Sequence, residues 1–149
     1  MIDSHCHLNF DTIAKNLKEV ILQSKKNNVT SILSINTNPK SFKDHLNLIK
    51  GYNGIYLSYG LHPCEVKSLD QLKFLEFYKY CNNPIVIGIG ETGIDLFHSK
   101  EDLIIQIKSF QLHIEASIKY NLPLIIHQRD SEDEIISILK DYTKYNLKA

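Results

Sequence analysis

The stretch Pro84-Ile-Val-Ile-Gly-Ile-Gly90, followed directly by Glu91, indicates the fold class of this chain. Its residues would be apolar on both faces of a strand, which is typical of a parallel sheet that is covered on each side. The carboxylate that follows has two readings. It is either a strand-end acid paired with a lysine or a functional group at the carboxyl edge of the sheet.

On both sides of this stretch, the chain alternates between expected strands and expected helices. Apolar runs of strand length and helical patterns of apolar residues recur five times. The expected strands cover residues 2–7, 30–35, 54–60, 84–90 and 122–126. The expected helices bury Ile13, Leu17, Val20 and Ile21; Phe42, Leu46 and Ile49; Leu72, Leu75 and Tyr78; Leu103, Ile107, Phe110, Ile114 and Ile118; and Ile135, Leu139 and Tyr142.

Three of the expected helices begin with a capping signal. Asn38 precedes Pro39, which is the order of a helix cap and a first-turn proline. Ser68 and Ser131 are each followed three residues later by Gln or Glu, which is the spacing of a capping box. We therefore expect helices to begin at these three points.

This alternation predicts a parallel α/β sheet, either doubly wound or closed as a (β/α)8 barrel. In a barrel, the carboxyl ends of the strands converge on one site. Four of the five expected strands end at groups that can bind a metal ion, namely His5 with His7, His62, Glu91 and His127. We expect these side chains to lie close together.

His5 and His7 are two residues apart in the first expected strand, so their imidazoles can point the same way and converge on one ion. Near-adjacent histidines are also common as surface residues, and His127 could instead bond to backbone at a helix entry. Imidazole and carboxylate ligands together suit zinc, manganese or magnesium-like ions. Two such ions bridged by Glu91 could activate water.

His62 and Arg129 each have a structural and a functional reading. His62 lies in a His-Pro loop, where it would either shape the turn or contact a substrate phosphate. Arg129 is the only arginine, and it would pair either with phosphate or with Asp130. Asp95 would orient the loop after the fourth strand or cap the next turn. Three further histidines are interpreted as surface or packing residues: His45, His98 and His113.

Composition narrows the possible functions. Lysine and arginine balance aspartate and glutamate at 17 each, so nucleic acid could bind only through a local patch. No apolar run approaches the ~20 residues of a membrane span, and Asp3 stands where a signal peptide needs apolar residues. Cys6, Cys64 and Cys81 lack Cys-x-x-Cys spacing and are interpreted as reduced thiols. We therefore expect a cytoplasmic protein with no membrane segment.

Four segments of the chain carry these candidate residues. They are Asp3-Ser-His5-Cys-His7-Leu8, Gly60-Leu-His62-Pro63, Gly90-Glu91-Thr-Gly93-Ile-Asp95 and Pro123-Leu-Ile-Ile-His127-Gln-Arg129-Asp130. In order and spacing they resemble the signatures of TatD-type metal-dependent deoxyribonucleases of the amidohydrolase-like superfamily. The resemblance implies a (β/α)8 TIM-barrel fold, one or two divalent metal ions, and DNA phosphodiester bonds as the substrate. It also implies that Glu91 bridges both metals and is catalytic, that His5 and His7 bind one metal, and that His127 binds the other.

The family barrel is longer than this chain, since such barrels have about 250 residues. The family's further metal histidine and its late catalytic aspartate have no counterpart within residues 1–149. We therefore expect these residues to form a single incomplete barrel domain, truncated to about five βα units.

Other functions remain open from the sequence. The superfamily shares its fold and metal chemistry among different reactions, so the substrate could be a small ester, lactone or amide. The chain could also be an inactive metal-binding remnant. A third alternative is a half-barrel that self-associates or needs a second chain to complete it.

Overall fold

The computed structural model describes residues 1–73, 75–145 and 147–149. Its strands form one parallel five-stranded sheet in the order β1-β2-β3-β4-β5. The strands are β1 (Ile2–Cys6), β2 (Ser31–Ser34), β3 (Ile55–Tyr59), β4 (Val86–Asp95) and β5 (Leu124–Arg129).

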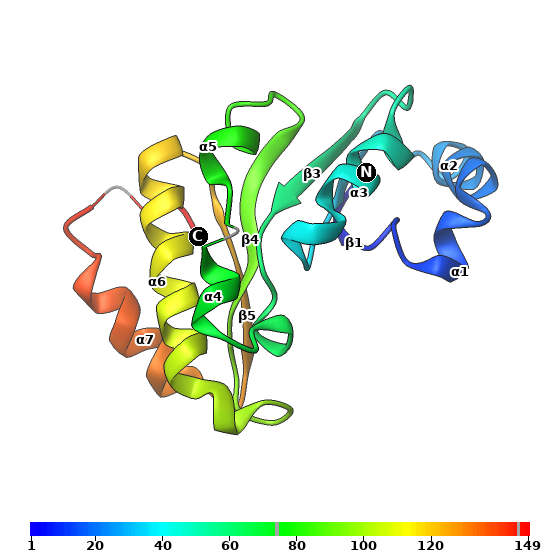
Figure 1. Cartoon of the computed structure of the whole chain (residues 1–149). Coiled ribbons are helices and arrows are strands. Elements are labelled where there is room, and N and C mark those ends of the chain that lie inside the picture. Colours follow the sequence, from blue (N-terminus) through cyan, green and yellow to red (C-terminus); the bar gives the residue numbers. More distant parts are fainter. Residues whose placement is uncertain (74, 146) are drawn as a thin grey trace.

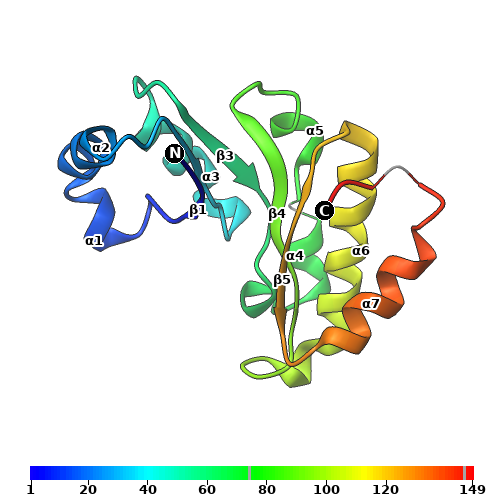
Figure 2. The same cartoon turned by 180° about the vertical axis from the view of Figure 1, so that it is seen from behind.

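The strand order decides between the two expected architectures. A doubly wound sheet reverses its strand order at a switch point, whereas the wall of a barrel keeps the order of the sequence. Here each strand pairs with the next one in the chain, and the sheet curves without closing (Figures 1 and 2). The five strands therefore form a half-barrel, and the doubly wound alternative is wrong.

The glycines of β4 agree with this conclusion. Gly88, Gly90 and Gly93 have the Gly-x-Gly-x-x-Gly spacing that forms a strand-to-helix turn in dinucleotide-binding sheets. All three lie inside β4, so here the spacing does not form a phosphate-binding turn.

Helices connect the strands along one side of the sheet. Figure 1 shows α6 and α7 beside β4 and β5, with α1, α2 and α3 toward the other end of the sheet. None of the helices in the described residues is long and apolar enough to cross a membrane. The helices are α1 (Asp11–Ala14), α2 (Leu17–Lys26), α3 (Phe42–Ile49), α4 (Leu69–Leu72), α5 (Phe77–Tyr80), α6 (Leu103–Tyr120) and α7 (Glu132–Asp141), and the short 3-10 helices are η1 (Pro39–Ser41), η2 (Pro63–Glu65) and η3 (Lys100–Asp102).

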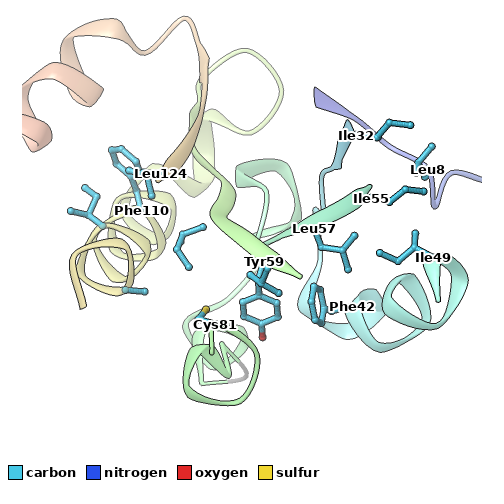
Figure 3. Close-up of a cluster of buried hydrophobic side chains, with 14 of the residues drawn as sticks. Leu8, Ile32, Phe42, Ile49, Ile55, Leu57, Tyr59, Cys81, Phe110 and Leu124 are labelled. Carbon is cyan, nitrogen blue, oxygen red and sulfur yellow. The ribbon is translucent and has the colours of Figure 1, made fainter. Parts of the chain in front are cut away.

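The hydrophobic core lies between the sheet and these helices (Figure 3). Tyr59 of β3 is fully buried, and its ring meets the rings of Phe42 and Phe77 edge-on at centroid distances of 4.8 and 5.6 Å. On the other side of β4, Phe110 of α6 is fully buried near Leu124 of β5. Aromatic and branched side chains thus fix the helices against the sheet.

The opposite face of the sheet is only partly covered. Tyr56 alternates with the buried Ile55 and Leu57 and is 37% exposed, while Ile87 follows the buried Val86 and is 36% exposed. Residues 86 and 88–90 are buried as expected, but Pro84 and Ile87 are exposed and Ile85 is half-buried, so the expected cover of residues 84–90 is incomplete. The physical reason is that a half-barrel cannot enclose its inner face.

The sheet has two edge strands in the described part of the chain, as an open half-barrel requires. β1 pairs only with β2, and β5 pairs only with β4. The outer edge of β5 is covered at one point, where the amide of Leu124 donates to the carbonyl of Lys148 at 2.7 Å. Open edges of this kind can pair with another strand.

Two expected helices are each broken into two in the structure. The helix expected from Ile13 onward ends at Ala14 and restarts at Leu17. Asn16 stands between them with a non-helical backbone, and its side chain donates to the carbonyl of Thr12, a local bond that competes with helix formation. The third expected helix becomes α4 and α5, so Tyr78 leaves the apolar stripe and is 71% exposed.

A helix begins at each of the three capping signals, but only two of the predicted caps form. The side chain of Asn38 accepts from the amide of Lys40 at 3.0 Å, and Ser68 forms its capping box with Gln71. The hydroxyl of Ser131 instead donates to the carbonyl of Ile94 at 2.7 Å. This bond joins the start of α7 to β4, so a tertiary contact has replaced the local cap.

Because α6 contains a buried histidine, we expect the stability of the fold to depend on pH. His113 is fully buried, accepts from the amide of Leu61 and contacts the carbonyl of Ser109. Burial lowers its pKa to about 4. The unfolded chain therefore takes up a proton between about pH 6.5 and 4 that the folded chain does not, so the free energy of unfolding falls as the pH drops through this range.

Because of this histidine, we expect the free energy of unfolding to be about 2 kcal/mol lower at pH 5 than at pH 7. Urea denaturation of the wild type and of His113→Gln at both pH values measures the effect. The glutamine amide oxygen can accept from Leu61 but does not titrate. The variant should lose less stability on acidification, and an equal loss in both proteins would contradict the prediction.

Candidate metal centre

Two of the predicted site residues lie inside strands rather than after them. Glu91 is in the middle of β4 and His127 is in β5, because both strands run further than expected. The register places Gly93 opposite His127. Gly93 has φ +142°, and a Cβ atom there would overlap the carbonyl oxygen of His127. Only glycine therefore allows β4 and β5 to approach so closely at the site.

Glu91 is the centre of a group of histidines. Its Oε2 atom lies 3.5 Å from Nε2 of His5, and its Oε1 atom lies 3.3 Å from Nδ1 of His127. Nε2 of His62 is 3.8 Å from Oε1. The ion pairs of Glu91 in the described residues are all with histidines, so the reading of an acid paired with a lysine is wrong.

These residues make two groups whose ligand atoms all lie within 4.8 Å of one another. The first contains His5 and His7, and the second contains His62 and His127. Glu91 belongs to both, so one carboxylate can reach ligands on either side. The structure therefore brings together every residue predicted to bind metal.

His7 is held so that one ring nitrogen stays free. Its Nδ1 atom lies 3.3 Å from the carbonyl of Ile35, and its ring stacks on Phe10 at a centroid distance of 4.6 Å. A backbone carbonyl at one nitrogen assigns the proton to that nitrogen and leaves Nε2 as the ligand. Metal-binding histidines usually have such a partner.

His127 is held in the same way by Asp95. The predicted cap of the next turn by Asp95 is confirmed, because its Oδ1 atom accepts from the amide of His98, but its contact with His127 was not predicted. Asp95 is 1% exposed, and its Oδ2 atom lies 3.0 Å from Nε2 of His127. Nδ1 of His127 is then directed at Glu91. A carboxylate behind a metal-binding histidine fixes its tautomer and orientation. The only sequence signal was the position of Asp95 four residues after Glu91.

His62 has a different hydrogen-bond pattern. Its Nδ1 atom accepts from the amide of Cys64 at 3.2 Å, so the neutral ring carries its proton on Nε2. That atom lies 3.1 Å from Nδ1 of His127. His62 therefore shapes its turn, as one reading proposed, and also presents an N–H donor to the site.

The titratable side chains of this centre shift one another's pKa values. Burial disfavours the ionised form of Glu91, but the hydrogen bond with His127 and the charges of His62 and His5 outweigh it and hold the pKa of Glu91 below its usual value. The hydrogen bond to Glu91 raises the pKa of His127. Burial and the charge of His127 lower the pKa of His62. An ionised carboxylate among imidazoles is suited to receive a cation.

Arg129 lies apart from both groups. Its guanidinium stands 5.4 Å from the ring centre of Phe97, and its side chain is exposed. It is two residues beyond His127 in β5 and therefore on the same face of the strand. An ion pair with Asp130 is not among the contacts of the described residues. A role in binding substrate stays a prediction.

The site opens to solvent through a hollow with a volume of about 350 Å³. Its walls combine two of the predicted metal ligands, His7 and Glu91, with side chains of neighbouring segments. The lining residues are His7, Phe10, Thr37, His62, Cys64, Glu65 and Glu91. This donor set of imidazole nitrogens and carboxylate oxygens fits a divalent metal of the zinc or manganese type.

Comparison with known proteins agrees with this geometry. The family described as TatD related DNase matches residues 2–149. An uncharacterized metal-dependent hydrolase of Buchnera aphidicola (strain Bp) is 38% identical over 144 residues, which cover 95% of this chain and 54% of the relative. A second metal-dependent hydrolase, from Buchnera aphidicola (strain APS), is 34% identical, and the match covers 57% of that relative.

A solved structure supports the same assignment. The crystal structure of YjjV, a TatD homologue from Escherichia coli, superposes with a TM-score of 0.85 at 27% identity, covering 95% of this chain and 56% of that one. The chain thus spans about half the length of the proteins that it matches. Its motifs, its half-barrel and its histidine-carboxylate centre all agree, and this chain belongs to the TatD family of metal-dependent hydrolases.

Proposed function

We propose that this chain provides the first half of the metal centre of a hydrolase that cleaves DNA phosphodiester bonds. The single observation that carries the proposal is that Glu91 belongs to both ligand groups. Zinc, manganese or magnesium bound there would activate water and polarise a phosphoryl oxygen. The description of the matching family supports DNA as the substrate.

The residues of the centre have distinct proposed roles. His5 and His7 hold one metal ion, His127 holds the second, and Glu91 bridges them. His62 donates from Nε2 to a substrate phosphate oxygen, because the amide of Cys64 occupies its other nitrogen. Arg129 contacts a more distant phosphate of the same strand from its place beyond His127.

A comparison of substrates tests the reaction class. The purified chain, loaded with Mn²⁺ or Zn²⁺, is assayed against a phosphodiester and against carboxylic esters, lactones and amides of the same chromophore. Faster metal-dependent turnover of the phosphodiester supports the proposal. Faster turnover of a carbonyl substrate would favour the ester or amide alternative. No turnover of either, below even the slow rate expected of an incomplete centre, would favour an inactive metal-binding remnant.

We also propose that the uncovered face of the sheet is completed by further polypeptide, either a second copy or a second chain. The two edge strands and the exposed Tyr56 and Ile87 support this proposal. Apolar surface of this kind commonly marks an interface.

We place the chain in the reducing cytoplasm, because its three cysteines are free thiols.

The isolated chain is therefore expected to self-associate or to be partly molten. Size-exclusion chromatography with light scattering, hydrophobic-dye binding and thermal unfolding measure these properties. Ile87→Lys should reduce dye binding and association, whereas Ile104→Lys on the exposed side of α6 should not. A sharp unfolding transition in a 17.2 kDa monomer that binds no dye would contradict the prediction.

A further inference from the structure

A third group of potential ligands lies on the far side of His127 from Glu91. It consists of Cys64 in η2, Asp95 at the end of β4 and His98 in the turn that follows, with ligand atoms within 4.8 Å of one another. We propose that these three residues form a separate site for a thiophilic divalent cation such as Zn²⁺. This proposal does not rest on the hydrolase activity.

The distances from Asp95 to the other two ligand atoms are close to those of a tetrahedral zinc site. Oδ2 of Asp95 lies 3.3 Å from Sγ of Cys64 and 3.0 Å from Nδ1 of His98. Usual zinc bond lengths place sulfur and oxygen about 3.5 Å apart, and nitrogen and oxygen about 3.3 Å apart. These two distances therefore differ from those of a bound ion by only a few tenths of an ångström, and the sulfur and nitrogen atoms lie within 4.8 Å of each other.

The hydrogen-bond pattern of Asp95 also favours a metal. Its Oδ1 atom accepts from the amide of His98 at 2.7 Å. Its Oδ2 atom is contacted by three groups, from Cys64, His98 and His127, but an oxygen has only two lone pairs. A single cation that replaced the protons of Cys64 and His98 would occupy one lone pair of Oδ2 and leave the other lone pair for His127.

The position of these ligands is fixed by a buried side chain of α6. Gln106 is fully buried, accepts from the amide of Asp95 at 2.7 Å, and donates to the carbonyl of Ser99 at 2.6 Å. It therefore holds the backbone on both sides of His98. A site whose supporting groups are already in place needs little ordering when a metal binds.

The site is open to solvent, because the side chain of His98 is 52% exposed while that of Asp95 is buried. A soft thiolate with one imidazole and one carboxylate selects zinc-like ions over magnesium. A water molecule would take the fourth position. Because Asp95 also contacts His127, an ion at this site would sit one imidazole away from the candidate hydrolytic centre.

Cobalt spectroscopy tests the proposal, because only a thiolate ligand gives Co²⁺ a sulfur-to-metal charge-transfer absorption. We expect this absorption on titration of the full chain with Co²⁺, and its loss in Cys64→Ser. The matched variants Cys6→Ser and Cys81→Ser should keep it. His98→Ala should weaken cobalt binding by at least about tenfold, the lower range for losing even an outer partner of a metal ligand.

Two further comparisons separate this site from the hydrolytic centre. Glu91→Gln should keep the absorption, whatever its effect on the other metals. If Cys64→Ser fails to fold by circular dichroism, the rate of Cys64 alkylation in the wild type, with and without one equivalent of Zn²⁺, decides the question. Protection of Cys64 supports the proposal. No absorption in the wild type, its loss in Cys6→Ser instead, or equal alkylation rates would overturn it.

Discussion

The variant Glu91→Gln is expected to bind Zn²⁺ or Mn²⁺ at the candidate centre at least about 100-fold more weakly than the wild-type chain, since loss of even an outer partner of a metal ligand costs 10–100-fold. Glu91 is the carboxylate shared by both ligand groups, so one substitution removes a charged ligand from each. Glutamine keeps the size of the side chain and removes its charge. Isothermal titration measures the affinity, with Cys64→Ser as the common background so that only this centre is observed.

Glu65→Gln is the matched control for this experiment. Glu65 lines the same hollow but is exposed, belongs to neither ligand group, and contacts Asn38. It should bind metal as the wild type does. The double variant His5→Ala/His7→Ala removes only one group and should leave the binding of one ion at the other. Equal affinity in the wild type and Glu91→Gln would show that Glu91 is not a ligand.

The second large effect concerns catalysis. We expect the 149-residue chain, assayed alone, to cleave a fluorescent DNA oligonucleotide at least about 1,000-fold more slowly than a full-length family member that cleaves it in the same metal buffer, because a catalytic acid-base group alone contributes about 10²–10⁴-fold. The chain spans about half the length of the proteins that it matches, and the resemblance implies that the family's late histidine and aspartate have no counterpart within residues 1–149.

The same assay has a clear contrary outcome. Cleavage at a rate comparable to that of the full-length enzyme, dependent on metal and abolished by Glu91→Gln, would mean that the chain replaces the two groups by its own residues or by association with a second copy. Light scattering under the assay conditions would then separate these two explanations. Residual cleavage that Glu91→Gln leaves unchanged would be assigned to a contaminating nuclease.

The sequence by itself determined the class of the fold and which side chains gather at the candidate metal centre. Strands and amphipathic helices depend on periodicities of two and 3.6 residues, which are local and visible in a single chain. The caps at Asn38 and Ser68 were predictable for the same reason, since their partners are two or three residues away. The pairing of His5 with His7 needed only the alternation of side chains along one strand.

Tertiary structure decided what depends on groups distant in the sequence. Asp95 is buried and holds His127, which is 32 residues away, and no local pattern shows which histidine a carboxylate will meet. The hydroxyl of Ser131 does not form its predicted cap, because it donates to the carbonyl of Ile94 at 2.7 Å instead. Glu91 acquired its place between two ligand groups from the register of neighbouring strands. Strand register and burial are set by packing across the whole sheet, so local patterns in the sequence do not show them.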